Sequence, residues 1–185
     1  MMSSLERRLA AIIAADPWRM HLLETVRRLN LSDWWIGAGF VRNGVWDHLH
    51  DNERGTPLND IDVIYFDRTN QTYEHDRKFE EQLKQREPKA PWSVKNQARM
   101  HAKNGFPPFN SSTDALSHWT ETATAVAVCL NAKGEVTIAA PYGLDDLFRC
   151  IAGPTPYFAD KPEIWQQRVQ QKQWQTLWPK VSLRA

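Results

Sequence analysis

Hydrophobic residues recur every three or four positions in several segments of the chain. Leu5, Leu9, Ile12 and Ile13 show this spacing near the N-terminus, and such a period is typical of an amphipathic helix. Helix ends are indicated by Pro near a start and by Asn, Gly or Pro after an end. The pattern predicts helices over residues 4–14, 17–29, 40–49, 70–87, 113–119, 144–150 and 162–177.

Other segments alternate or run continuously apolar over a few residues. Ile61, Val63 and Tyr65 alternate with their neighbours, which indicates a strand. Strands are predicted over residues 34–37, 60–66, 92–101, 123–130 and 136–140. Helices interleaved with strands predict an α/β (α+β) single domain, a mixed sheet flanked by helices. Within 1–185 we expect N-terminal helices (4–29), a sheet core (34–150) and a C-terminal helical tail (157–185).

Composition narrows the class of protein. The chain has 185 residues, of which 42 % are hydrophobic and 24 % charged, so disordered and collagen-like classes are excluded. The formal charge of +1 gives no overall attraction to nucleic acid or a membrane surface. No apolar run reaches the about 20 residues of a membrane helix, and no convincing signal peptide precedes the fold. Two cysteines, Cys129 and Cys150, are too few for a disulfide framework, so we expect a reduced, cytoplasmic protein with no membrane partner.

Nine tryptophans are spread along the whole chain. Most of them are expected to pack in the core, where large rings bury the most area. Two alternatives remain open: a ring that stacks on a base or sugar, and an exposed set that forms a protein interface.

A Gly-x-Gly turn, Gly37-Ala38-Gly39, follows the first predicted strand and opens a helix. Glycine permits close backbone approach, and a helix N-terminus offers free N–H groups to an anion. This geometry suits phosphate binding. Such a turn also serves simply to connect two elements.

Two acids lie at the start of the next predicted strand. Asp60 and Asp62 point to the same face, because side chains alternate along a strand. Neighbouring carboxylates repel each other unless a cation lies between them, and hard oxygen ligands suit Mg²⁺. The alternative is a pair of solvated acids at a strand end.

The two features occur in one strand–turn–helix–strand unit. Asp60 follows Gly39 by 21 residues, which is enough for one helix and a return loop. The turn and the two acids can then lie at the same end of adjacent strands. One would bind phosphates and the other their metal ion, an arrangement that favours phosphoryl or nucleotidyl transfer.

The same segment resembles the nucleotidyltransferase superfamily. Residues 38–43, AGFVRN, are similar to the Gly-Gly-x-Val-Arg-Asp motif of tRNA-nucleotidyltransferases and bacterial poly(A) polymerases, and residues 58–63, LNDIDV, to the segment that carries their metal-binding aspartates. The whole chain looks like a bacterial family of nucleotidyltransferase-like proteins of about this size. The stretches typical of that family are residues 92–101, 122–126 and 154–156.

The resemblance implies roles for five residues. Gly37 and Gly39 would cradle the nucleoside triphosphate (NTP), Asp60 and Asp62 would hold one or two Mg²⁺ ions as the catalytic pair, and Arg42 would lie near the phosphates. An ion pair that ties the helix to a loop is the alternative for Arg42.

Three departures from the family pattern stand out. Ala38 replaces a glycine, and Asn43 replaces an aspartate. Many members also have a further carboxylate on a neighbouring strand, which has no clear counterpart here. The weak candidates for it are Glu87, Glu121 and Asp146.

The predicted strand over 92–101 adds a cationic face. Alternation places Lys95, Gln97, Arg99 and His101 on one side, where Lys95 and Arg99 could meet a triphosphate. A solvated sheet face is the alternative. The histidines His48, His50 and His101 lack the spacing of a zinc site, and Asp145 and Asp146 are explained by a helix N-terminus.

The predicted function is Mg²⁺-dependent transfer of a nucleoside monophosphate from an NTP to an acceptor, with release of pyrophosphate. The sequence does not identify the acceptor: RNA, protein and small molecules all remain. The alternative is an inactive nucleotide- or RNA-binding module of the same fold.

Overall fold

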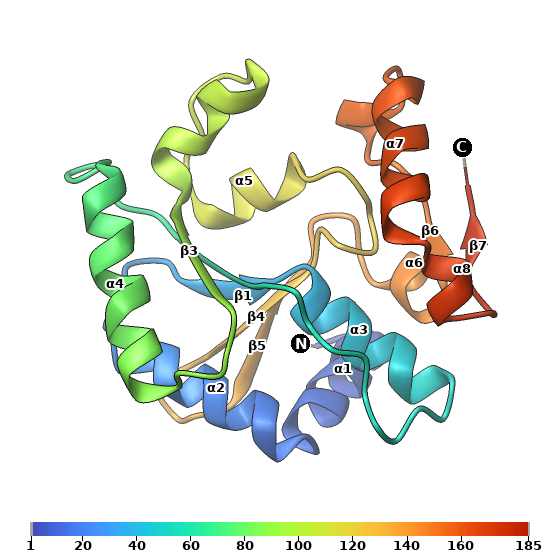
Figure 1. The fold of residues 1–185 in the computed structure, drawn as a ribbon, viewed down its shortest axis with the longest axis horizontal. Helices are drawn as coiled ribbons and strands as arrows, with labels where there is room; N and C mark the ends of the chain where they lie inside the picture. The colour runs from blue at the N-terminus through green and yellow to red at the C-terminus, as the bar shows by residue number, and fades with distance from the viewer. Residues whose placement is uncertain (1, 185) are drawn as a thin grey trace.

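A computed structural model describes residues 2–184, except for the side chain of residue 104. Helices and strands are interleaved along this part of the chain (Figure 1). The helices are α1 (Ser4–Ala14), α2 (Pro17–Arg27), α3 (Gly39–Leu49), α4 (Tyr73–Arg86), α5 (Ser112–Ser117), α6 (Asp145–Phe148), α7 (Pro162–Lys172), α8 (Trp174–Leu177) and the 3-10 helices η1 (Gln97–Asn104) and η2 (Pro156–Phe158). The strands are β1 (Trp35–Gly37), β2 (Ile61–Tyr65), β3 (Trp92–Asn96), β4 (Ala127–Leu130), β5 (Val136–Ala139), β6 (Ile151–Ala152) and β7 (Ser182–Leu183).

Five strands form one mixed sheet in the order β3-β2-β1-β4-β5. β1 is antiparallel to both β2 and β4, whereas β2 and β3 are parallel. Trp35 pairs with Ile64 and Ile36 with Val63, so the end of β1 meets the start of β2. The antiparallel pairing therefore brings the turn after β1 and the acids of β2 to one end of the sheet.

Local sequence signals set the N-terminal helices. Ser3 and Glu6 form a reciprocal capping box at the start of α1, and Asp16 caps α2 directly before Pro17. Leu9 and Ile13, on one face of α1, are fully buried. Each such side chain contributes on the order of 1.5–3 kcal/mol by leaving water, so the amphipathic pattern attaches this helix to the core.

The predicted strand over 92–101 is wrong beyond Asn96. The side chain of Asn96 accepts hydrogen bonds from the backbone amides of Asp67 and Ala98 and donates to the carbonyl of Asp67. This side chain therefore replaces the next strand hydrogen bonds and starts η1. The predicted helix over 162–177 is interrupted at Gln173, whose φ of 46° lies in the left-handed region, so this segment forms α7 and α8. The other predicted helices and strands are present, with ends that differ by a few residues, and β6, β7 and η2 are additional short elements.

Tryptophans build the core beneath the C-terminal segment. Trp46 of α3 packs edge-to-face on Trp178 with ring centroids 5.3 Å apart, and Trp165 stacks on Trp174 at 5.8 Å. The indole N–H of Trp178 donates to Asp47 at 2.8 Å. These contacts fix the segment after α7 against α3. Trp18 is the tryptophan that stands out as exposed, at 45 %.

Within residues 2–184, none of the helices has the length and apolar character needed to span a bilayer.

Candidate nucleotide-binding site

The turn after β1, the central strand, places the start of α3 at one end of the sheet. Ala38, which precedes α3, has φ 51° and ψ −125°, and no side chain caps the helix. The first amides of a helix have no acceptor within it and carry the positive end of the dipole. This end of α3 is therefore suited to an anion.

Asp60 and Asp62 lie at the start of β2. Burial, followed by the charge of Asp60, raises the pKa of Asp62 above its ordinary value, while the charge of Lys95 opposes this. The ammonium Nζ of Lys95, on β3, is 3.8 Å from Oδ1 of Asp62. The two carboxylates are thus only partly compensated, and their hard oxygen donors suit a divalent cation such as Mg²⁺.

One cavity of about 280 Å³ joins these elements. Gly39, Arg42, Asp60, Asp62 and Lys95 all line it. The remaining lining residues come from the same segments and from more distant ones: Ala38, Ile64, Gln97, Met100, His118, Trp119, Thr120, Glu121, Thr124, Phe158, Arg168 and Lys172. The structure therefore brings five of the seven predicted site residues to one cavity.

Arg42 is buried in this wall with 7 % of its surface exposed. Its Nη2 donates to Oδ1 of Asn43 at 2.9 Å, and its guanidinium carbon lies 5.5 Å from the ring centroid of Trp46 and 5.8 Å from that of Trp178. No ion pair of Arg42 occurs among the described residues, and Nε has no hydrogen-bond partner there. Burial lowers the pKa of Arg42 to about 10. The ion pair considered as an alternative role is thus not formed.

Asn43 is the replacement for the aspartate of the motif. It keeps an oxygen that accepts the hydrogen bond from Arg42 but brings no negative charge. Asn43 therefore does not neutralise the guanidinium charge, which is stabilised inside the protein by the faces of tryptophan rings.

The structure does not bring Gly37 to the cavity. A Cβ atom at Gly37 would lie 3.0 Å from Cη2 of Trp119 and 3.2 Å from the carbonyl oxygen of Val126. The absence of a side chain makes room for the Trp119 ring, and through that ring Gly37 shapes the cavity wall.

Arg99 is also directed elsewhere. Because Asn96 ends the strand, Arg99 lies in η1, where its guanidinium pairs with Asp76 and covers the ring of Tyr73 at 4.3 Å. The alternation that placed Arg99 beside Lys95 does not continue into a 3-10 helix.

The three candidates for a further carboxylate have different environments. Glu87 pairs with His21, and Asp146 pairs with Arg184. Glu121 lines the cavity, but Arg168 binds both of its oxygens.

The described residues contain no cluster of three or more acidic, histidine or cysteine side chains that could hold a metal ion. Asp60 and Asp62 remain the carboxylates that face the cavity without a bidentate basic partner.

Sequence reasoning missed Arg168, Lys172 and Trp119. Arg168 and Lys172 lie on α7, one turn apart on the same helix face. That spacing was the available signal, but many solvated helices also contain it. Only the packing of α7 beside the cavity distinguishes these residues.

Comparisons with known proteins agree with this geometry. A family model described as nucleotidyltransferase matches residues 24–183. An NMR structure described as a CCA-adding enzyme head domain is 34 % identical, covers 96 % of this chain and 95 % of its own, and has a TM-score of 0.85. No curated protein was found to match the sequence.

Two larger enzymes share the fold at lower identity. A CCA-adding enzyme in complex with CTP is 15 % identical over 96 % of this chain, with a TM-score of 0.60. The Thermotoga maritima CCA-adding enzyme complexed with tRNA is 16 % identical over 97 %, with a TM-score of 0.57. This chain spans 43 % and 42 % of their respective lengths.

The comparisons confirm the predicted superfamily and the mixed, helix-flanked sheet. A match over most of the chain, together with the shared head-domain fold, establishes that the chain belongs to the nucleotidyltransferase family.

Proposed function

We propose that this protein transfers a nucleoside monophosphate from an NTP to an acceptor and releases pyrophosphate, with Asp60 and Asp62 as the catalytic pair. One observation carries the proposal: the start of α3 and both carboxylates open onto the same cavity. The solved relative with CTP supports an NTP as the donor. The acceptor class stays open among RNA, protein and small molecules.

In the transfer step, a bond forms between the acceptor oxygen or nitrogen and the α-phosphorus. The bond from that phosphorus to the bridging oxygen breaks, and its electron pair leaves on pyrophosphate. The proton of the acceptor passes to water. Such a reaction depends mainly on positioning and on neutralising charge.

The residues of this chain divide these tasks. The amides at the start of α3, at Gly39, bind phosphate oxygens, and Arg42 and Lys95 neutralise phosphate charge. Asp60 and Asp62 would hold Mg²⁺, which supplies Lewis-acid polarisation of the phosphates when bound. Gly37 acts through the position of the Trp119 ring.

The test is substitution of either aspartate. Asp60→Asn and Asp62→Asn should each reduce Mg²⁺-dependent pyrophosphate release by at least about 100-fold, because each removes one of the two carboxylates. Asp145→Asn, which removes an exposed carboxylate at the start of α6, is the matched control and should retain activity. A folded Asp62→Asn protein with full transfer activity would contradict the proposal.

A second candidate function is nucleotide or RNA binding without catalysis. The observation that favours it is Lys95: β3 presents an ammonium to Asp62 rather than another carboxylate. Calorimetric titration with nucleotides, paired with a pyrophosphate assay over a broad acceptor panel, separates the two functions. Nucleotide binding without pyrophosphate release supports the non-catalytic binding function.

A further inference from the structure

The C-terminal helix α7 adds two cations to the cavity. Arg168 and Lys172 line it from α7. This helix lies near the C-terminus, far in sequence from the strand–turn–helix unit that holds Asp60 and Asp62. Figure 1 shows α7 beside the end of the sheet where α3 begins, with α5 and η1 on the other side. The site is therefore built partly by the end of the chain.

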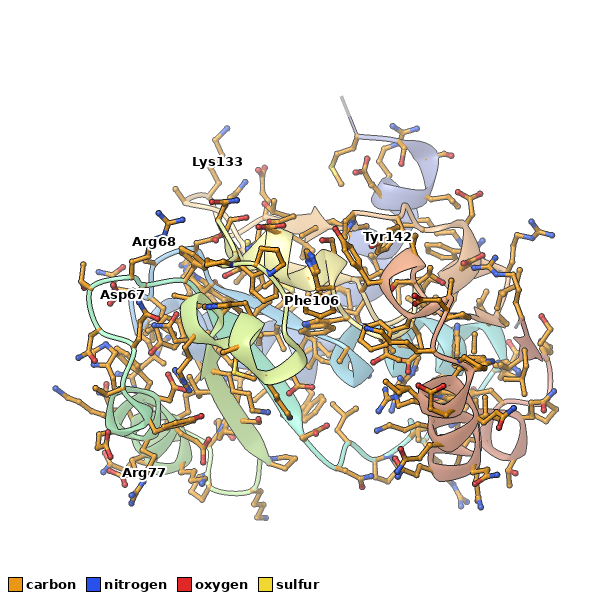
Figure 2. All side chains as sticks on the ribbon, turned by 90° about the horizontal axis from the view of Figure 1, so that it is seen from above. Asp67, Arg68, Arg77, Phe106, Lys133 and Tyr142 are labelled. Carbon is orange, nitrogen blue, oxygen red and sulfur yellow. The ribbon has the colours of Figure 1, made fainter. Side chains whose placement is uncertain are left out.

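A set of aromatic contacts fixes the segment leading into α7. The ring of His118 stacks on Tyr157 with centroids 3.8 Å apart, and Phe106 lies 5.6 Å from Tyr157 and 6.2 Å from Phe158. Phe106 is labelled near the centre of Figure 2. These rings hold η2 against η1 and α5, so α7 starts from a defined position.

The cavity has an excess of positive charge. Four cationic side chains and three carboxylates line it, a formal excess of one positive charge with His118 neutral. Glu121, 1 % exposed, is fully engaged: Nη2 of Arg168 donates to Oε2 at 2.9 Å, and the hydroxyl of Thr124 donates to the same oxygen at 2.7 Å. Glu121 therefore orients the Arg168 guanidinium, and its charge acts on the other cations only from a distance, without an ion pair among the described residues.

Two cations are left without a carboxylate. Within the described residues neither Arg42 nor Lys172 forms an ion pair, and Arg42 is more than nine-tenths buried with an unpartnered Nε. Burial, and then the charges of Arg168 and Arg42, lower the pKa of Lys172. Cations that are partly withdrawn from water and repel one another are destabilising unless an anion neutralises them.

We infer that Arg42, Arg168 and Lys172 together bind the β- and γ-phosphates of the NTP, the part that leaves as pyrophosphate. The inference rests on the proposed function and names residues for it on α7, with Glu121 as a positioning residue for Arg168. Three converging cations suit a polyphosphate, since guanidinium groups bind its oxygens through paired hydrogen bonds and a lysine adds a point charge. Asp60 and Asp62, which line the same cavity from the start of β2, are then left to the α-phosphate and the metal ion.

The test compares Lys172→Met with Lys84→Met. Both variants remove one lysine charge from the last turn of a helix, but Lys84 lies on α4 and pairs with Glu80 outside the cavity. Calorimetric titrations with inorganic pyrophosphate, an NTP and the corresponding nucleoside monophosphate give the affinities without any turnover. Losing one hydrogen bond to a charged group corresponds to about 10- to 100-fold in affinity.

We expect Lys172→Met to lose about 10- to 100-fold in affinity for pyrophosphate and for the NTP, with the affinity for the monophosphate unchanged. Lys84→Met should match the unmodified protein for all three ligands. Unchanged pyrophosphate affinity in Lys172→Met overturns the inference. So does an equal loss for the monophosphate, which would indicate an acceptor or α-phosphate contact.

Arg168 requires a paired variant, because Arg168→Met alone leaves the buried Glu121 carboxylate without its charged partner. The double variant Arg168→Met with Glu121→Gln removes both charges and should also weaken pyrophosphate binding. Wild-type pyrophosphate affinity in that folded double variant overturns the role of Arg168.

Binding and transfer can fail separately. If the pyrophosphate pattern appears but no acceptor is modified, the proposed function fails and the binding site stands. If transfer occurs and Lys172→Met binds pyrophosphate normally, the α7 site fails and the proposed function stands.

Discussion

Replacing Ala38 with glycine should stabilise this protein, because Ala38 occupies a backbone region that glycine favours. Its φ of 51° and ψ of −125° match the first central position of a type II′ turn. A non-glycine residue in such a region is destabilised by about 1–3 kcal/mol. Glycine loses about 0.5–1 kcal/mol more conformational entropy than alanine on folding. The net effect of Ala38→Gly is therefore a gain of about 1 kcal/mol in the free energy of unfolding.

Urea unfolding measures this gain. With a slope of about 2 kcal/mol/M, a gain of 1 kcal/mol moves the midpoint up by about 0.5 M, and the melting temperature of a chain this long rises by about 2–4 °C. Ala11→Gly, at an exposed position inside α1, is the matched control and should lower stability by about 1 kcal/mol. A midpoint for Ala38→Gly at or below that of the unmodified protein, with an unchanged slope, would refute the strain argument.

Three further substitutions test the structural assignments. Gly37→Ala should lower stability by about 1–3 kcal/mol and change tryptophan fluorescence, because its new Cβ meets the Trp119 ring; unchanged fluorescence would contradict this packing. Glu121→Gln should destabilise the protein by about 3 kcal/mol by leaving Arg168 unpaired, a loss that chemical denaturation detects; wild-type stability would show that the pair is dispensable. Arg99→Met should lower stability by a similar amount, because it leaves Asp76 unpaired. Its nucleotide affinity, measured by calorimetry on the folded protein, should stay the same, and a weaker affinity would indicate that Arg99 contacts the nucleotide.

Local signals account for much of the candidate site. The Gly-x-Gly turn, α3 and the acids of β2 lie within about 30 consecutive residues, and the only tertiary step is the antiparallel pairing of two neighbouring strands. Alternation along β2 then places Asp60 and Asp62 on one face whatever surrounds them. These features could be predicted because each depends on a short segment.

Two positions show what the local pattern leaves out. Alternation beyond Asn96 was expected to continue, but the Asn96 side chain takes the hydrogen bonds of the next residues and begins η1. Gly37 was assigned to phosphate, whereas the Trp119 ring from a remote segment occupies the space beside it. At Asn96 a local hydrogen bond to Ala98 combines with contacts to Asp67 across the fold, and at Gly37 the contact with Trp119 comes from a remote segment.

The sequence by itself determined most of the helices and strands, the mixed sheet and the pair of carboxylates at the start of β2, because short-range periodicity and spacing specify them. Only the tertiary structure decided that Arg168 and Lys172 face those carboxylates, that Glu121 is held by Arg168, and that Arg42 lies buried among tryptophans. These relations join residues from segments far apart in the sequence, and they form because burying Trp46, Trp174 and Trp178 packs the end of the chain against α3.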